Sequence, residues 1–231
     1  SECGPPRGAV PDKVKEKAEM LRGFVDAVNV TDNQTAMVRM SSFAACVILK
    51  QMGLDPILQM VTRDRNRLAM QSDILAAYAN GIRNIVCLSG DHQSFGDCPQ
   101  GQNVHDLDSM QLIQTVRHMR DEGKFLGGDD ILRPPRMFVG AAANPFADPF
   151  EIRVARLAKK VAAGANFIQT QLIYDIPRFK EYMKKIVDMG LHEKTAILAG
   201  IGPLNLSVNV SARQFENAGF IDEVANLLRI T

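Results

Sequence analysis

The sequence has almost no net charge and no long apolar run. It carries 27 Lys and Arg against 26 Asp and Glu over 231 residues, a formal charge of +1. No global field therefore attracts nucleic acid or an anionic membrane surface. The longest apolar run, around Phe43 to Leu49, is far too short to span a bilayer. We expect a small molecule as the partner, with no nucleic acid and no membrane.

The sequence also lacks paired cysteines and histidines. Its four cysteines lie far apart without a CxxC pair, and its histidines share no metal-ligand spacing, so the sequence suggests neither a disulfide framework nor a zinc site. We therefore expect reduced thiols and no metal. The first residues, Ser-Glu-Cys-Gly-Pro-Pro, do not have the basic and then apolar character of a signal segment. We expect a cytoplasmic protein.

Two nucleotide-binding motifs are missing as well. The chain contains no Gly-x-Gly-x-x-Gly and no Walker loop. Their absence argues against a Rossmann dinucleotide site and against a P-loop nucleotide site.

Short apolar runs alternate with helical patterns at a nearly regular interval, which is typical of a parallel sheet with crossover helices. The expected strands are Ala27–Thr31, Pro56–Val61, Asn84–Ser89, Met137–Ala142, Asn166–Gln171 and Ala196–Ile201. The expected helices are Pro11–Arg22, Ser41–Met52, Arg65–Asn80, Ser109–Glu122, Pro149–Ala163 and Pro177–Met189. Three of the helices end at a glycine suited to a left-handed cap, namely Gly81, Gly164 and Gly190.

Each expected strand ends in polar or small residues, which in a closed parallel barrel converge on one face. An open doubly wound sheet would also gather polar groups at its carboxyl ends, so this pattern leaves closure open. The strand count favours a single α/β domain over residues 1–231, a (β/α)8 TIM barrel.

Several residues at these strand ends are suited to chemistry. Glu2, in the first strand, would have a raised pKa if buried and would then be a general acid, whereas the simpler reading is a solvated terminal glutamate. Ser89-Gly90-Asp91 offers backbone N–H groups and a carboxylate to a heterocycle, or Asp91 merely caps the next loop. The amide of Gln171 suits the edge of a pterin or flavin ring.

The basic residues near the strand ends can each be interpreted either as surface charges or as phosphate contacts. Lys160 is by default a solvated cation at a helix end, and only its context would make it a phosphate contact. The cluster "TRDRNR" at residues 62–67 places three arginines around a helix start. They would grip a diphosphate or, more commonly, form surface ion pairs.

Taken together, residues 2 to about 204 resemble the methylenetetrahydrofolate reductase family, most closely its short bacterial forms. The stretches that carry the resemblance are "ECGPPRG", "VDAVNVTDNQTAMVRMSS", "RDRNRLAMQSDILAAYANGIRNIVCLSGDH", "VGAAANP", "KKVAAGANFIQTQLIYD" and "ILAGIGPL".

The resemblance implies a role for each matched residue. Glu2 would protonate the folate, Asp91 would tune the flavin and stabilise the folate cation, and Gln171 would order the pterin. The residues implied as cofactor contacts are Thr31, Gln59, Ser89, Gly90, Asp91, Ala142, Asn144 and Lys160. Gln59 stands where many relatives have histidine, and Asn144 where many have an aromatic residue. These two departures leave the choice between FAD and FMN open.

The implied reaction is a flavin-dependent, ping-pong reduction of 5,10-methylenetetrahydrofolate to 5-methyltetrahydrofolate. NAD(P)H or a partner protein would reduce the flavin, and the folate would then receive hydride in the same cleft. The acetogenic relatives suggest an iron–sulfur partner subunit. The electron donor and a homo-oligomeric state stay open.

The segment 205–231 departs from the family pattern. It resembles the second strand and following helix of the EAL family of cyclic-di-GMP phosphodiesterases, with a strand at Leu206–Val210 and a helix at Ile221–Arg229. Too few residues precede this strand for a crossover helix, so the closing βα unit is irregular or not native to the barrel. The Glu-x-Leu motif is absent, which argues against phosphodiesterase activity. Two alternatives therefore stand beside the reductase: a chimeric barrel without turnover, and a pterin-binding methyltransferase barrel without flavin.

Overall fold

The computed structural model describes residues 1–201 and 206–210. Contacts between Cα atoms divide the chain into two compact units, Ser1–Val139 and Gly140–Thr231. The single domain expected over residues 1–231 therefore stays a prediction. Within the described ranges, none of the helices combines the length and the apolar character that crossing a bilayer requires.

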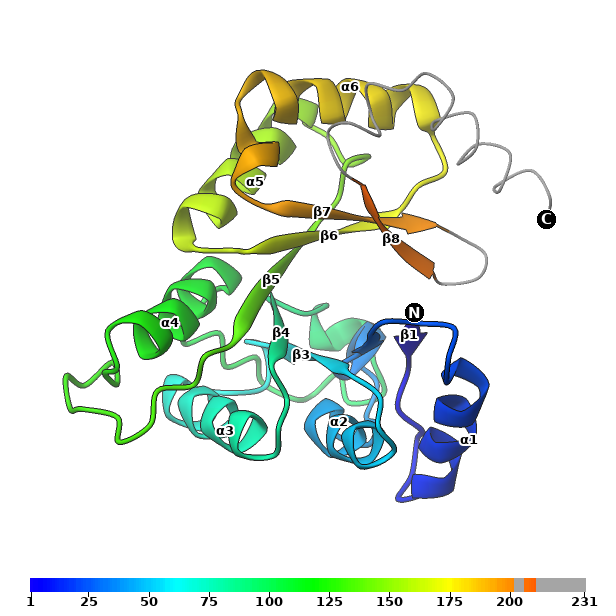
Figure 1. The fold of residues 1–231 in the computed structure, drawn as a ribbon, viewed down its shortest axis with the longest axis vertical. Coiled ribbons are helices and arrows are strands. Elements are labelled where there is room, and N and C mark those ends of the chain that lie inside the picture. Colours follow the sequence, from blue (N-terminus) through cyan, green and yellow to red (C-terminus); the bar gives the residue numbers. More distant parts are fainter. Residues whose placement is uncertain (202–205, 211–231) are drawn as a thin grey trace. The chain divides into compact units, whose positions relative to one another are not determined.

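The first unit consists of parallel strands that alternate with helices (Figure 1). Its strands pair in chain order and are β1 (Glu2–Cys3), β2 (Val28–Val30), β3 (Pro56–Val61) and β4 (Asn84–Leu88). Its α-helices are α1 (Pro11–Leu21), α2 (Ser42–Gln51), α3 (Arg67–Ala79) and α4 (Ser109–Asp121). Two short 3-10 helices, η1 (Gln34–Ala36) and η2 (Gln93–Phe95), lie in the loops after β2 and β4. The predicted alternation of strand and helix is confirmed here.

The two faces of this sheet differ in burial. Side chains alternate between the faces along a strand, and residues paired in parallel register share a face. One such row is at most 1% exposed and consists of Cys3, Val30, Leu58 and Ile85. The adjacent row, on the other face, includes two polar residues, Glu2 and Asn29. The buried row forms the core, and the polar row carries the candidate acid.

The second unit continues the same pattern for three strands. Its strands are β5 (Phe138–Ala143), which crosses the boundary between the units, β6 (Phe167–Leu172), β7 (Ala196–Ile201) and β8 (Leu206–Val210). Its α-helices are α5 (Phe150–Ala163) and α6 (Ile176–Asp188), and the 3-10 helix η3 (Leu191–Glu193) precedes β7. β5, β6 and β7 are parallel neighbours. The α/β class is thus the same in both units.

The last described strand breaks the parallel pattern. β8 has the predicted bounds, but it pairs antiparallel with β7. Antiparallel neighbours need only a short connection, whereas a parallel pair needs a crossover of a dozen or more residues. The join between β7 and β8 is therefore irregular, as expected, but β8 is an antiparallel neighbour and not the parallel strand of a closing βα unit. The helix expected at residues 221–229 lies outside the described residues.

The predicted helix caps are confirmed. Gly81, Gly164 and Gly190 each have a positive φ, of 82°, 119° and 62°. Glycine adopts this left-handed conformation without steric cost, and it ends the helix that precedes each buried strand.

Candidate active site

The predicted site residues fall into the two units. Glu2, Thr31, Gln59, Ser89, Gly90 and Asp91 belong to the first unit, on β1 to β4 or directly after them. Ala142, Asn144, Lys160 and Gln171 belong to the second unit. Most of them lie at or just after the carboxyl end of a parallel strand, whereas Glu2 begins β1, Gln59 lies within β3 and Lys160 lies on α5.

Glu2 has the environment expected of a general acid. Its side chain is half-buried, and this burial is the main cause that raises the pKa of the carboxyl above its usual value. Asn29 opposes the shift, because its Nδ2 donates to Glu2 Oε2 at 3.5 Å, and the N-terminal amine and Lys17 also lower the pKa. This burial disfavours the reading of Glu2 as a fully solvated terminal residue, while its role as a general acid stays a prediction.

Asp91 is exposed and holds a neighbouring loop. Its Oδ2 accepts a hydrogen bond from the backbone N–H of Thr35 at 2.8 Å. Its backbone carbonyl accepts one from Arg63 at 2.9 Å. The carboxylate thus caps a loop that lies 56 residues away in sequence, rather than the loop that follows it. Its expected contacts to flavin and folate stay predictions.

The arginines of residues 62–67 are each paired with a carboxylate. Arg63 contacts Asp64 at 2.6 Å, Arg65 contacts Asp32 at 2.7 Å, and Arg67 contacts Asp106 at 2.8 Å. The pairs of Arg63 and Arg65 are not the surface pairs expected, because the side chains of these arginines are 4% and 18% exposed. Since each of the three guanidinium groups already has a carboxylate partner, a role in binding a diphosphate is disfavoured.

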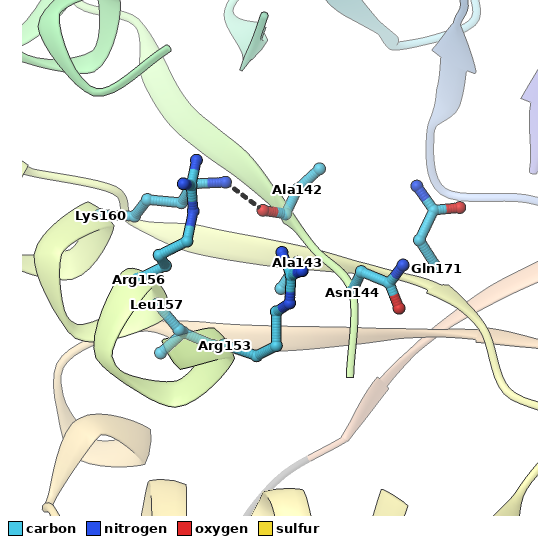
Figure 2. A pocket seen from close by; sticks show the side chains of 8 residues that line it. All are labelled: Ala142, Ala143, Asn144, Arg153, Arg156, Leu157, Lys160 and Gln171. Atoms are coloured by element: carbon cyan, nitrogen blue, oxygen red, sulfur yellow. Dashed lines mark hydrogen bonds between the residues drawn. The ribbon is translucent and has the colours of Figure 1, made fainter. Parts of the chain in front are cut away.

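A pocket in the second unit gathers the other predicted residues (Figure 2). The cavity has a volume of about 200 Å³ and lies between the end of β5, the end of β6 and α5. Its lining residues are Ala142, Ala143, Asn144, Arg153, Arg156, Leu157, Lys160 and Gln171. Four of the residues predicted to bind cofactor or substrate therefore line one cavity.

The pocket is strongly cationic. Arg153, Arg156 and Lys160 project from α5 toward the end of β5 (Figure 2), and no carboxylate is among the eight lining residues. Lys160 Nζ donates to the carbonyl of Ala142 at 2.5 Å, so it is not a solvated helix-end cation. Arg153 donates to two backbone carbonyls, those of Ala147 and Asp148. The three positive charges make this cavity suited to an anion.

Sequence reasoning missed Arg153 and Arg156. The signal was present, since residues 153, 156 and 160 are spaced by three and four positions and therefore share one face of a helix. The buried residues of α5, Val154 and Leu157, are interleaved with them, and Leu157 also contributes to the wall of the pocket. The apolar residues hold the helix against the sheet, and the cations are thereby held at the ends of the strands.

The geometry fits a diphosphate better than a metal. Among the described residues, no group of three or more His, Cys, Asp or Glu is placed to hold a metal ion. Guanidinium and ammonium groups are instead the usual partners of phosphate oxygens. The residues of the pocket therefore fit the phosphate part of a nucleotide cofactor.

Comparison with known proteins gives a consistent result. A family model described as "Methylenetetrahydrofolate reductase" matches residues 2–218, so the match continues past residue 204, where we expected the resemblance to end. A Caenorhabditis elegans protein named "Probable methylenetetrahydrofolate reductase (NADPH)" is 26% identical over 172 residues, which are 72% of this chain and 23% of that protein. The 5,10-methylenetetrahydrofolate reductase of Salmonella typhimurium is 24% identical over 162 residues, 68% of this chain and 47% of its own. The chain thus spans less than half the length of these curated relatives.

Solved structures share the fold at low sequence identity. A structure titled "Uncharacterized protein from Clostridium thermocellum binds two copies of 5-methyl-5,6,7,8-tetrahydrofolic acid" has a TM-score of 0.59 and 12% identity, with 99% of this chain and 81% of that chain covered. A 2,3-dimethylmalate lyase, a member of the PEP mutase/isocitrate lyase superfamily, has a TM-score of 0.56 and 13% identity, with 98% and 78% covered. These similarities concern the fold alone.

Proposed function

Because the chain belongs to the methylenetetrahydrofolate reductase family, whose members are TIM barrels, we propose that it reduces 5,10-methylenetetrahydrofolate to 5-methyltetrahydrofolate with a bound flavin. The observation that carries this proposal is the cationic pocket, where Ala142, Asn144, Lys160 and Gln171 meet. These are the residues of the second unit that the family resemblance implies as cofactor and substrate contacts. Their common cavity supports the assignment of this surface to ligand binding.

We propose FAD rather than FMN as the flavin. FAD carries a diphosphate, whereas FMN carries a single terminal phosphate, and the pocket offers three cations. Lys160 lines the pocket, where its ammonium group donates to the carbonyl of Ala142 near the end of β5, and it would contact a phosphate oxygen there. Arg156 and Arg153 would complete the charge balance. The isoalloxazine ring of the cofactor supplies hydride transfer when it is bound.

Glu2 is the proposed proton donor to the folate. Its raised pKa keeps a larger fraction of the carboxyl protonated near neutral pH than an exposed glutamate would have. The hydrogen bond from Asn29 fixes the carboxyl on the polar face of the first sheet. Gln171 would orient the pterin through its amide, which donates and accepts at once. Asp91 would stabilise positive charge on the folate.

The proposed reaction is ping-pong, with NAD(P)H or a partner protein as the first electron donor. An iron–sulfur subunit as that partner and a homo-oligomeric assembly are part of this proposal. The shared fold of the Clostridium thermocellum protein that binds 5-methyltetrahydrofolate is compatible with folate as the substrate class. A cytoplasmic location fits a reaction between soluble small molecules.

The identity of the flavin and its pocket can be tested together. The purified protein is expected to be yellow, with an absorbance maximum at about 450 nm from the flavin. Chromatography of the released cofactor should identify FAD. The double variant Arg156→Ala with Lys160→Ala should lose at least about 90% of the bound flavin, because two of three phosphate contacts are removed. Lys159→Ala is the matched control, since Lys159 is exposed on α5 and does not line the pocket. Release of FMN, or full flavin content in the double variant, contradicts the assignment.

The role of Glu2 is tested by separating the two half-reactions. Glu2→Gln should leave flavin reduction by NAD(P)H intact and abolish reoxidation by methylenetetrahydrofolate, because an amide does not supply the proton. Stopped-flow absorbance follows both steps. Normal folate turnover in this variant rules out the proton-donor role.

A further inference from the structure

The side chain of Gln34 lies on the same polar face as the candidate acid. Its Oε1 accepts a hydrogen bond from the hydroxyl of Thr31, the residue that follows β2. Its amide also covers Gly4, since a Cβ placed on that glycine would lie 3.2 Å from Gln34 Oε1 and 3.3 Å from Nε2. The amide thus spans the ends of β1 and β2.

The register of these strands places the amide beside Glu2. Glu2 pairs with Asn29, and the ladder continues because the N–H of Thr31 donates to the carbonyl of Cys3 at 3.3 Å. Gly4 and Thr31 each follow this first pair by two residues, so they share its face in extended chain. Gln34 therefore lies next to Glu2 along the strand direction, at the carboxyl side.

The loop that carries Gln34 is held in a costly conformation. Asn33, Thr35 and Ala36 have positive φ values of 43°, 55° and 56°. Non-glycine residues rarely adopt this region, and such strain is found mainly at functional sites. Two contacts maintain it: Asp91 accepts from the N–H of Thr35, and Asn33 Oδ1 accepts from the N–H of Arg39 at 3.0 Å.

The close packing around the loop confirms that its position is tightly restricted. A Cβ on Gly96, which follows η2, would lie 1.8 Å from the carbonyl oxygen of Ala36. The backbone of Gly96 therefore approaches this loop more closely than any other residue type would allow. This packing restricts the backbone of the loop that carries Gln34.

The hydrogen-bonding capacity of the amide is only partly used. Its oxygen is occupied by Thr31, while its Nε2 group has no acceptor in the described part of the protein. The side chain is half-buried, and Nε2 is not one of the enclosed side-chain atoms that lack a partner, so its two N–H donors reach solvent. An amide with a fixed oxygen and free N–H donors recognises a carbonyl oxygen.

On the basis of the proposed function, we propose that Gln34 is a substrate-binding residue that donates a hydrogen bond to a carbonyl oxygen of the folate. This contact orients the folate beside Glu2 for proton transfer. Gln34 is thus a specificity residue of the first unit, in addition to the Gln171 expected in the second. Asp91 then acts partly as a positioning residue, through its hydrogen bond to the loop.

The decisive variant is Gln34→Glu. A glutamate keeps the length of the side chain and an acceptor for the Thr31 hydroxyl, but it lacks the N–H donors. The dissociation constant for 5-methyltetrahydrofolate, measured by titration of the flavin-loaded protein, should rise by about tenfold or more, as expected for loss of one hydrogen bond. The KM for methylenetetrahydrofolate should rise in parallel, while flavin content and the rate of reduction by NAD(P)H stay unchanged.

A second pair of variants tests the same contact without altering Gln34. Gly4→Ala should weaken folate binding, because the added methyl group would lie 3.2 Å from Gln34 Oε1 and 3.3 Å from Nε2, which is tighter than an ordinary contact, so the amide has to shift. Gly8→Ala is the control, since the nearest atom to its Cβ is Val10 Cγ2 at 3.6 Å, an ordinary contact distance. Gly8→Ala should bind folate as the unaltered protein does.

The outcomes separate this inference from the proposed function. If the unaltered protein binds 5-methyltetrahydrofolate and Gln34→Glu binds it equally well, Gln34 is purely structural and the inference is overturned. A change in flavin binding with unaltered folate affinity also overturns it. If the unaltered protein with its flavin binds no folate, the proposed function itself is wrong.

Discussion

The buried ion pair between Asp32 and Arg65 allows a quantitative test of how the first unit is held together. The carboxylate of Asp32 is completely buried and accepts hydrogen bonds from the N–H of Val61 at 3.1 Å and from Arg65 at 2.7 Å. Asp32→Asn keeps the shape of the side chain but removes its charge. Both of these donors bond Oδ2, so the amide oxygen of the asparagine keeps them, and the new NH2 group takes the place of Oδ1, which faces Arg65 Nη2 at 3.5 Å. The buried guanidinium thereby loses its charged partner at this position.

The expected loss of unfolding free energy depends on the ion pair that Arg65 keeps in the variant. Removing one partner of a buried ion pair typically costs about 3–5 kcal/mol of unfolding free energy. Arg65 keeps a second carboxylate, Asp73, at 3.0 Å, and is partly exposed to solvent. We therefore expect the lower end of that range, about 3 kcal/mol.

The matched control replaces the other partner of the same arginine. Asp73 is 36% exposed, so Asp73→Asn should cost less than about 1 kcal/mol. Urea unfolding, followed by circular dichroism and by hydrogen exchange of the strand amides, measures both variants. An Asp32→Asn variant as stable as Asp73→Asn refutes the reasoning.

Three further predictions concern packing and pH. Gly140→Ala places a methyl group 2.2 Å from the ring of Phe167 and should lower the unfolding free energy by about 1–3 kcal/mol in a thermal or urea melt. The side-chain and backbone hydrogen bonds from Arg67 lower the pKa of Asp106 to about 2, so Asp106→Asn should reduce stability at pH 6, and this deficit should vanish as the pH falls from about 4 to about 2. An undiminished deficit at pH 2 contradicts the assignment. The rate of flavin reoxidation by folate should fall as the pH rises through the raised pKa of Glu2, and a pH-independent rate argues against its acid form as the donor.

The sequence predicted the elements well where local signals were strong. The bounds of β3 and β7 are the predicted ones, because apolar runs there are enclosed by turn and cap residues. Helix α4 begins at the predicted Ser109, where Asp108 and Gln111 form a capping box. Such signals depend only on residues that are close together in the chain, so the sequence reveals them without knowledge of the fold.

The structural features that the sequence did not predict depend on contacts between residues far apart in the chain. The pair of Asp32 with Arg65 joins positions 33 residues apart, and nothing in the local pattern marks it as buried. The positive φ values around Gln34 occur at residues other than glycine, so the sequence gives no sign of them. The antiparallel pairing of β8 was missed because a strand pattern does not specify the direction of pairing.

Only part of the candidate site could be predicted from the sequence, because the pocket joins segments that are far apart in the chain. Lys160, Ala142 and Gln171 were selected from a family resemblance, and the structure brings them to one pocket. Arg153 and Arg156 share a helix face with Lys160, but a helix face of cations is more often solvated than bound to a ligand. Only the pocket distinguishes these alternatives.

In the proposed reaction, a flavin bound to this chain passes hydride to a folate. The most direct measurement is anaerobic: the purified protein is reduced with NADH or dithionite, excess reductant is removed, and 5,10-methylenetetrahydrofolate is added. We expect the absorbance at about 450 nm to return and 5-methyltetrahydrofolate to form in an amount equal to that of the reoxidised flavin. A reduced flavin that stays bleached in the presence of the folate would contradict the proposed reaction.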